Sequence, residues 1–464
     1  MEYENLKNAL LSNVDMGLKY ASTVDRNAEF ELYLFYQQRT LVNITQGVVD
    51  AADGIVEGNA VRVAKQNRLS FTSSSGISIE RIKRSVNEAV ASLRSVSIKD
   101  TRFKRFCEPK KPGKEGAFTD KILNLGKEEL IEIANGMVKE AQDFDKRIHT
   151  VGSECAAEWG GFAVGNTLGL QQASRSAINR CEVYCIAVAG EERRTAWEAD
   201  VTRERLIKTS GVGVEAARKA VNLLGAQKLN KTTVLPTIWS PVAAAAYVVA
   251  GLGQAASGEH VVEGRSPIAD KLGKEVGNPK LTITDNGQSP SGVNTDAIDA
   301  EGHPQQKTTL IAKGELSQFV FDTYYAHIYG SESTGNCARH SRPFGSTLPY
   351  ETSPSILPKN MEVEPGRKSL DDLIASIDGQ AILIVDTPIG IFHSNVATGE
   401  FSAVAQSVFL VEKGEKKFPL QPVSVSGNFY AGLRQLLAVG DDLEKTIFAV
   451  ETPTLIFDGF SIVG

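Results

Sequence analysis

The spacing of the histidines decides what metal chemistry this sequence offers. A zinc site on a helix needs two imidazoles one turn apart, with a carboxylate between them that activates water. The chain has six histidines, and no two of them lie within five residues of each other: His149, His260, His303, His327, His340 and His393. We therefore predict that the chain binds no metal ion through such a motif, and no other pattern identifies a catalytic residue.

A short polar loop at residues 333–336 is a second candidate for chemistry. Its spacing does not fit the G-x-S-x-G turn that exposes a nucleophilic serine. Its backbone and side chains could instead contact an extended ligand, or the loop could be a tight turn, and the sequence leaves both open. The loop consists of Ser333, Thr334, Gly335 and Asn336. Cys337 follows with no readable base beside it, so we expect an inert, small apolar side chain there.

One histidine and one glycine-rich segment complete the candidates. His260 lies between Glu259 and Glu263, and a carboxylate can orient an imidazole as a base. The alternative is a surface histidine near a helix C-terminus. Residues 251–256 fit a G-x-G-x-x-A dinucleotide fingerprint, which requires a preceding strand. The alanines before it favour a helix, so a nucleotide-dependent enzyme is the weakest alternative that we consider.

The elements that position these residues follow from hydrophobic periodicity. Spacings of three and four predict helices, and runs rich in aromatic and β-branched residues predict strands. In the first half we expect helices at 4–22, 78–95, 127–142 and 212–225, and strands at 30–44 and 60–71. Glycines divide residues 148–200 into what we predict to be short extended pieces. The Lys-, Pro- and Gly-rich stretch 103–118 is predicted to be a solvated loop.

The polar stretch near residue 228 suggests a domain boundary. Beyond it we predict a strand at 233–239, an alanine-rich helix from Pro241, and a helix at 370–377 with Ser369 as N-cap. Further strands are expected at 381–386, 407–412 and 423–425. Helices and strands in unequal runs favour an α+β fold. We therefore predict an N-terminal α/β domain (1–228) and a C-terminal β-rich domain with a few helices (229–464).

Composition narrows the class of protein. The 464 residues are 42% hydrophobic and 23% charged, with a net charge of −6, which is ordinary for a globular protein. The acidic balance argues against a nucleic-acid binder. The sequence shows neither a signal peptide nor an apolar run near the roughly 20 residues that a membrane span needs. Five cysteines without a paired framework suit a reducing compartment, so we predict a cytoplasmic protein.

Several segments of the second half resemble the TldD/PmbA family of cytosolic peptidase-complex proteins. The resemblance rests on 299–306, 310–316, 324–326, 333–336 and 397–402. In that family one kind of subunit carries an H-E-x-x-x-H zinc motif and a ligand cysteine near the C-terminus. The corresponding segment here, 241–257, contains neither His nor Glu, and all five cysteines lie before residue 338. The chain is therefore most similar to the PmbA/TldE-like subunit that lacks the zinc motif.

The resemblance implies a function and a partner. It implies a dimer, either with a zinc-bearing TldD-like paralogue or with a second copy, that degrades or processes unfolded or extended peptides. Zinc would be bound by the partner only, and this chain would need no cofactor. The substrate would contact Ser333, Thr334, Gly335 and Asn336, with Tyr325 and His260 as further candidates. An older label of the family, modulator of DNA gyrase, supplies the alternative of a non-enzymatic protein-binding regulator.

Overall fold

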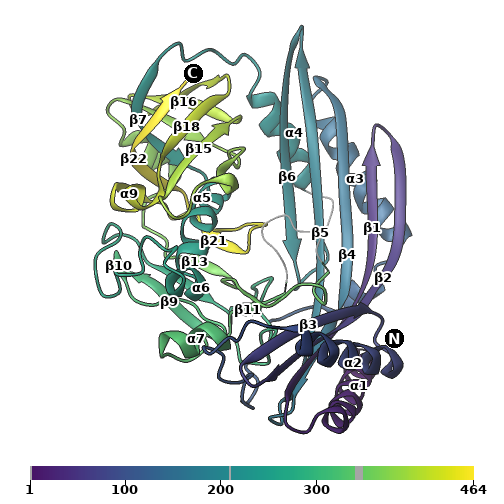
Figure 1. Ribbon diagram of the computed structural model, residues 1–464. Helices are drawn as coiled ribbons and strands as arrows, with labels where there is room; N and C mark the ends of the chain where they lie inside the picture. The colour runs from purple at the N-terminus through teal and green to yellow at the C-terminus, as the bar shows by residue number, and fades with distance from the viewer. Residues whose placement is uncertain (1–2, 208–210, 340–347) are drawn as a thin grey trace.

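An antiparallel sheet with long strands forms the N-terminal half of the protein (Figure 1). The structure is a computed structural model that describes residues 3–207, 211–339 and 348–464. The sheet has six strands in the order β3-β2-β1-β4-β5-β6. Their bounds are β1 (Glu29–Thr45), β2 (Val48–Lys65), β3 (Arg68–Ser75), β4 (Ile148–Asn166), β5 (Gln171–Ala189) and β6 (Glu192–Thr202).

Four helices cover one face of this sheet. They are α1 (Tyr3–Val24), α2 (Ile79–Ser95), α3 (Lys127–Phe144) and α4 (Val212–Asn222), with a short 3-10 helix at Asp120–Asn124. Successive side chains of a strand point to opposite faces. Accordingly Phe30, Leu32 and Leu34 of β1 share a core with the helices, whereas Tyr33 and Phe35 point to the other face. The predicted helices are confirmed, although α4 ends three residues earlier than predicted.

Two strand predictions in this half are wrong. The predicted strand 60–71 is divided by a turn at Gln66 and Asn67, whose φ angles of 52° and 60° are left-handed. The pieces predicted within 148–200 are three continuous strands, and two of them, β4 and β5, have 19 residues each. Glycine marks close approach here: a Cβ on Gly160 would lie 2.1 Å from the Tyr36 carbonyl oxygen.

In its described residues, the C-terminal half contains three sheets, and the mixture of helices and extensive sheets confirms the α+β class. The largest has eight strands: β7 (Thr232–Trp239), β14 (Gln380–Ile384), β15 (Glu400–Ala405), β16 (Val408–Glu412), β17 (Glu415–Leu420), β18 (Val423–Asn428), β19 (Leu436–Val439) and β22 (Leu455–Val463). A six-stranded sheet contains β8 (Ile283–Asn286), β9 (Lys307–Ala312), β10 (Glu315–Leu316), β13 (Met361–Val363), β20 (Glu444–Lys445) and β21 (Val450–Thr452). The pair β11 (Cys337–Ala338) and β12 (Ser355–Ile356) forms the third.

Short helices connect these sheets. They are α5 (Pro241–Val248), a π-helical turn (Val249–Gly253), α6 (Gly258–Val262), α7 (Thr323–Tyr329), α8 (Leu370–Ala375), a 3-10 turn (Ile391–His393) and α9 (Phe429–Arg434). Ser369 caps α8 as predicted, because its side chain accepts a hydrogen bond from the Asp372 N–H. In the described ranges, no helix is long and apolar enough to cross a membrane.

The alanine-rich helix α5 lies in the core of the C-terminal half (Figure 1). Alanines 243–246 are completely buried, and the Tyr247 hydroxyl donates a 2.7 Å hydrogen bond to the Phe429 carbonyl oxygen. The glycines that follow lie in the π-helical turn rather than after a strand. The helix that the alanines predict is confirmed, and residues 251–256 do not form a dinucleotide-binding turn, because a helix and not a strand precedes them.

A long irregular segment between α2 and α3 contacts the C-terminal half. Residues 103–118 form no helix or strand and most of them are exposed, as predicted, but the segment also makes contacts with the C-terminal half. The Gly113 N–H donates to the Ala297 carbonyl oxygen at 2.8 Å, and Arg102 pairs with Glu263 at 2.8 Å. The division at residue 228 stays a proposal. The six-stranded N-terminal sheet nevertheless uses only residues 29–202, and the other sheets begin at residue 232.

The close packing of α3 and α4 leads to a first prediction. A Cβ on Gly213 would lie 2.1 Å from the Met137 carbonyl oxygen, so Gly213→Ala must move one helix away from the other. We expect the free energy of unfolding in urea to fall by about 1–3 kcal/mol. Gly54→Ala is the control, because nothing lies within 4 Å of its Cβ position. Equal effects of both substitutions would contradict this packing.

Candidate substrate-binding site

A buried network of charges connects the two halves of the protein. Arg62 of β2 binds Glu31 of β1 at 2.7 Å and Glu301 of the C-terminal half at 2.6 Å. Arg339 binds the other oxygen of Glu31 at 3.1 Å. Burial alone would lower the pKa of Arg62, but Glu31 and Glu301 raise that pKa well above its usual value. The four side chains therefore form one network of ion pairs that spans both halves.

The turn next to this network is built around Asp299. Its carboxylate accepts hydrogen bonds from the N–H groups of Glu301, His303 and Cys337, at 2.9, 2.9 and 3.0 Å. Gly302, in the same turn, has a left-handed φ of 87°. Burial, and then the charge of Glu301, raise the pKa of Asp299 to about 7. The first of the resembling segments therefore forms a turn that fixes Glu301 beside Arg62.

The predicted loop 333–336 is packed inward. Thr334 Oγ1 accepts a 2.7 Å hydrogen bond from the Phe321 N–H, and Ser333 Oγ donates to the Phe321 carbonyl oxygen at 3.1 Å. Asn336 donates to Asp285 at 2.6 Å. Gly335 has a φ of 74°, and a Cβ there would lie 2.3 Å from the backbone of residue 304. These bonds hold the loop in place, while Ser333 and Thr334 also line a surface pocket of about 270 Å³.

Tyr325 and His260 lie on two helices that contact each other, α7 and α6. The pKa of Tyr325 is raised to about 12, first by burial and then by the charges of Glu259 and Glu263, which flank His260. These glutamates pair with Arg265 and Arg102, and the buried Nδ1 of His260 has no partner in the described part of the chain. Among the described residues, no carboxylate therefore hydrogen-bonds His260 to orient it as a base.

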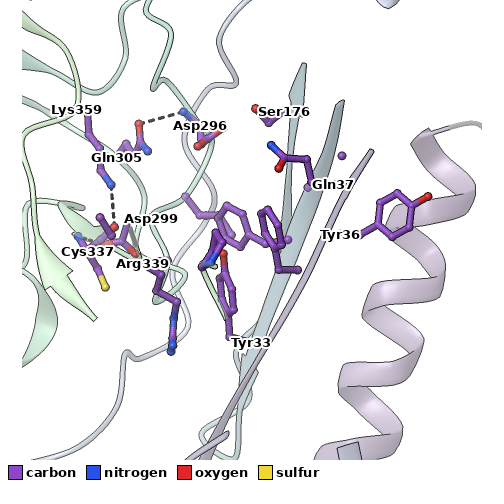
Figure 2. A pocket seen from close by; sticks show the side chains of 18 of the residues that line it. Tyr33, Tyr36, Gln37, Ser176, Asp296, Asp299, Gln305, Cys337, Arg339 and Lys359 are labelled. Carbon is purple, nitrogen blue, oxygen red and sulfur yellow. Dashed lines mark hydrogen bonds between the residues drawn. The ribbon is translucent and has the colours of Figure 1, made fainter. Parts of the chain in front are cut away.

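A separate cavity lies between the two halves, and the sequence did not indicate it. It has a volume of about 190 Å³ and is lined by the helix-free face of the N-terminal sheet and by residues 296–305 and 337–339. Figure 2 shows Lys359, Gln305 and Asp296 along one side of it and Tyr33 below, while Tyr36 points away. The rings of Tyr33 and Phe162 stack at 5.3 Å. None of the six predicted contact residues lines this cavity.

Two charged groups of this cavity have spare hydrogen-bonding capacity. Lys359 is 8% exposed, and its ammonium donates to the Cys337 carbonyl oxygen at 2.8 Å. In the part of the chain that the structure describes, Arg203 is the cation within 4.0 Å of the Asp296 carboxylate, and its distance of 3.8 Å is longer than a hydrogen bond. Burial raises the pKa of Asp296, whereas Arg203 and Lys359 oppose that rise. The cavity thus combines an aromatic wall with the ammonium of Lys359 as a donor and the carboxylate of Asp296 as an acceptor.

Metal ligation finds no support in the described ranges. They contain no group of three or more His, Cys, Asp or Glu side chains suited to a metal ion. In α5 and the following π-helical turn, the side chains are Ala, Val, Leu, Gly and Pro apart from Tyr247, whose hydroxyl is used in the core. These residues do not fit a zinc ion, which requires N, S or O ligands. His340 lies outside the described residues.

The charged residues that were not predicted from the sequence have partners that are far away along the chain. Glu31 and Arg62 occur in ordinary strand patterns, and Arg62 meets Glu301 across 239 positions of sequence. Glu301 lies in one of the segments that resemble the family, 299–306, but nothing in the sequence indicated its partner. A charged residue at an inward position of a strand could have indicated an ion pair. Such residues are almost never fully buried unless they are paired.

Comparison with known proteins identifies the family. Residues 232–464 match the PmbA/TldA metallopeptidase C-terminal domain, and residues 120–224 match the PmbA/TldA metallopeptidase central domain. The chain belongs to the PmbA/TldD family. It is similar to the metalloprotease PmbA of Escherichia coli O157:H7, with 26% identity over 400 residues that cover 83% of this chain and 81% of the relative.

Solved structures share the fold over almost the whole chain. TldE from Thermococcus kodakarensis superimposes with a TM-score of 0.86 at 24% identity, covering 98% of this chain and all of that one. A candidate modulator of a DNA gyrase from Thermotoga maritima gives 0.85 at 22% identity, covering 97% and 99%. At these identities the likeness establishes the architecture, and the function requires its own argument.

The buried charge network generates a second prediction. Arg62→Met removes the cation that compensates Glu31 and Glu301, and uncompensated buried charges are costly. We expect the free energy of unfolding in urea to fall by about 3–5 kcal/mol. Arg84→Met is the matched control, since its pair with Glu88 is solvent-exposed and should contribute little. Similar losses in both variants would show that Arg62 does not connect the halves.

His303 provides a prediction about pH. Its Nδ1 donates to the Pro304 carbonyl oxygen at 3.0 Å, its buried Nε2 has no partner in the described part of the chain, and burial lowers its pKa. The folded protein therefore keeps the imidazole neutral, while the unfolded chain takes up a proton below about pH 6.5. Stability from this group is present above pH 6.5 and is lost as pH falls through the lowered pKa.

The measurement is urea unfolding of the wild type and His303→Asn at pH 7.5 and pH 5.5. Asparagine retains a donor for Pro304 and cannot titrate. The loss of unfolding free energy between the two pH values should be smaller in the variant by up to about 1.4 kcal/mol. Comparing the two proteins at each pH cancels the opposite contribution of Asp299, whose raised pKa favours folding at lower pH. A pH dependence that does not change would contradict a neutral, buried His303.

Proposed function

We propose that this chain is the metal-free subunit of a cytoplasmic metallopeptidase complex whose catalytic zinc is bound by a TldD-like partner. In the complex it would help to enclose and hold unfolded or extended peptides during their degradation or processing. One observation carries the proposal. The helix at which the family's zinc-bearing subunits place their motif is here an apolar core helix, with alanines 243–246 completely buried. Such side chains pack the interior and cannot ligate zinc.

An exposed sheet edge supports a role in holding peptides. In the described part of the chain β6 pairs only with β5, and Figure 1 shows β6 as the strand of its sheet nearest the C-terminal half. Its last residues, 200–202, line a cavity of about 270 Å³ together with residues 289–293 of the C-terminal half. Unpaired N–H and C=O groups at a sheet edge bind extended peptides with little regard to sequence. The predicted contacts at residues 333–336, Tyr325 and His260 remain proposals for the same role.

Reconstitution tests this function. The chain is purified alone and then mixed with its zinc-type paralogue, and zinc content and casein hydrolysis are measured in each sample. We expect no stoichiometric zinc and no hydrolysis with this chain alone, and hydrolysis in the mixture that exceeds that of the paralogue alone. A paralogue whose zinc-motif glutamate is replaced by glutamine is the control and should give an inactive mixture. Stoichiometric zinc with activity in this chain alone would refute the proposal.

A non-enzymatic regulator is the second candidate. It is favoured by the likeness to the Thermotoga maritima protein described as a candidate modulator of a DNA gyrase. Purified gyrase should then bind this chain without the paralogue, and casein should not compete. Binding that appears only with unfolded chains would instead favour the peptidase subunit.

A further inference from the structure

The cavity between the halves carries an inference about the substrate. We propose that it binds the α-carboxylate end of a peptide, or a free amino acid, with Lys359 holding the carboxylate, Asp296 the adjacent N–H and the aromatic wall the side chain. This deepens the proposed function and rests on it for the source of the ligand. The chemistry required is an α-carboxylate, a neighbouring N–H group and one large apolar side chain.

The size of the cavity restricts the ligand to about one residue. Its volume is about 190 Å³. One water molecule takes roughly 30 Å³ of liquid, and pockets for drug-sized ligands have roughly 300–1,000 Å³. A long segment of peptide therefore does not fit, whereas a single large residue does. The end of a chain can place one residue in such a cavity while the rest of the peptide stays outside it.

Lys359 is the group in this cavity that suits an anion. In the described part of the chain no carboxylate lies within 4.0 Å of its ammonium nitrogen, which donates to one carbonyl oxygen and has three hydrogens. The neighbouring Asp299 is occupied by three backbone N–H groups. The other lining cation, Arg339, already pairs with Glu31. An α-carboxylate would satisfy the two remaining donors of a largely buried ammonium.

The remaining groups suit the rest of a terminal residue. Asp296 is 24% exposed as a side chain, and its backbone N–H is held by Gln305 at 3.0 Å, so its position is fixed while its carboxylate stays accessible. The wall of Tyr33 and Phe162 presents stacked rings, with the Arg339 guanidinium 4.6 Å from the Tyr33 ring. Aromatic walls favour a large apolar or aromatic side chain at the end of the peptide.

Titration calorimetry on this chain alone tests the inference. The probes are acetyl-Ala-Ala-Phe with a free carboxylate, its C-terminal amide, and free phenylalanine. We expect the acid to bind at least tenfold more tightly than the amide, as a charge-assisted bond to a buried group would give. If the peptide acid binds more tightly than phenylalanine, the ligand of the cavity is the end of a peptide. If phenylalanine binds more tightly, the ligand is a free amino acid. Equal binding of acid and amide, or no binding of any probe, overturns the inference.

Variants locate the recognition. Lys359→Met should reduce the acid-to-amide ratio to within twofold, while Lys359→Arg should keep most of it. Lys274→Met is the control, because the Lys274 ammonium also donates to a carbonyl oxygen, that of Asp270 at 2.9 Å, but Lys274 does not line this cavity and should leave the ratio unchanged. Methylating the last amide nitrogen of the acid should weaken binding to the wild type several-fold but not to Asp296→Ala. A ratio preserved in a folded Lys359→Met protein would place the carboxylate elsewhere.

The assay separates this inference from the proposed function. It uses neither zinc nor the partner, so it does not depend on casein hydrolysis. Equal binding of acid and amide together with an active reconstituted mixture would overturn the cavity assignment and leave the subunit role intact. If this chain binds the acid more tightly than the amide but the reconstituted mixture is inactive, the result would support carboxylate binding in the cavity and refute the subunit role.

Discussion

The structure depends on the four-residue network in which Arg62 compensates Glu31 and Glu301, and Arg339 shares Glu31. All four charges are largely removed from water, so separating the halves would leave buried charges without partners or require water to enter. An apolar interface would tolerate sliding, whereas ion pairs at 2.6–3.1 Å fix both distance and direction. The cavity between the halves owes its shape to this constraint, because Arg339 belongs to both the network and the cavity wall.

The same constraint explains the arrangement of the resembling segments. Asp299 and Gly302 form the turn that presents Glu301, and residues 333–336 anchor the chain just before Cys337 and Arg339. Their side chains and N–H groups are largely occupied by internal hydrogen bonds. The groups with spare capacity, Asp296 and Lys359, lie next to these segments instead. A recognisable motif in this fold therefore marks the scaffold of the site more than the ligand contacts.

Sequence reasoning succeeded where the physical signal is local. The helices α1, α2 and α3 follow from apolar side chains at spacings of three and four, and α8 from the cap at Ser369. It failed where a residue's role depends on a distant neighbour. Gly160 and Gly161 suggested strand ends, yet they continue β4 because their Cβ positions would meet the backbones of β1 and β5. Glu31 and Arg62 gave no local sign of a partner in the other half.

The apolar helix α5 and the charged interface between the halves have different roles in this fold. A zinc-binding helix must direct polar ligands into an open space, and the buried alanines and the glycine in contact with Phe429 instead fill a dense core. In this chain the helix is therefore a packing element, with side chains that fill the interior. Side chains with free hydrogen-bonding groups lie at the interface instead. There, Lys359 and Asp296 line a cavity beside the ion network. The polar groups with free hydrogen-bonding capacity thus lie where the two halves meet and not on the core helix.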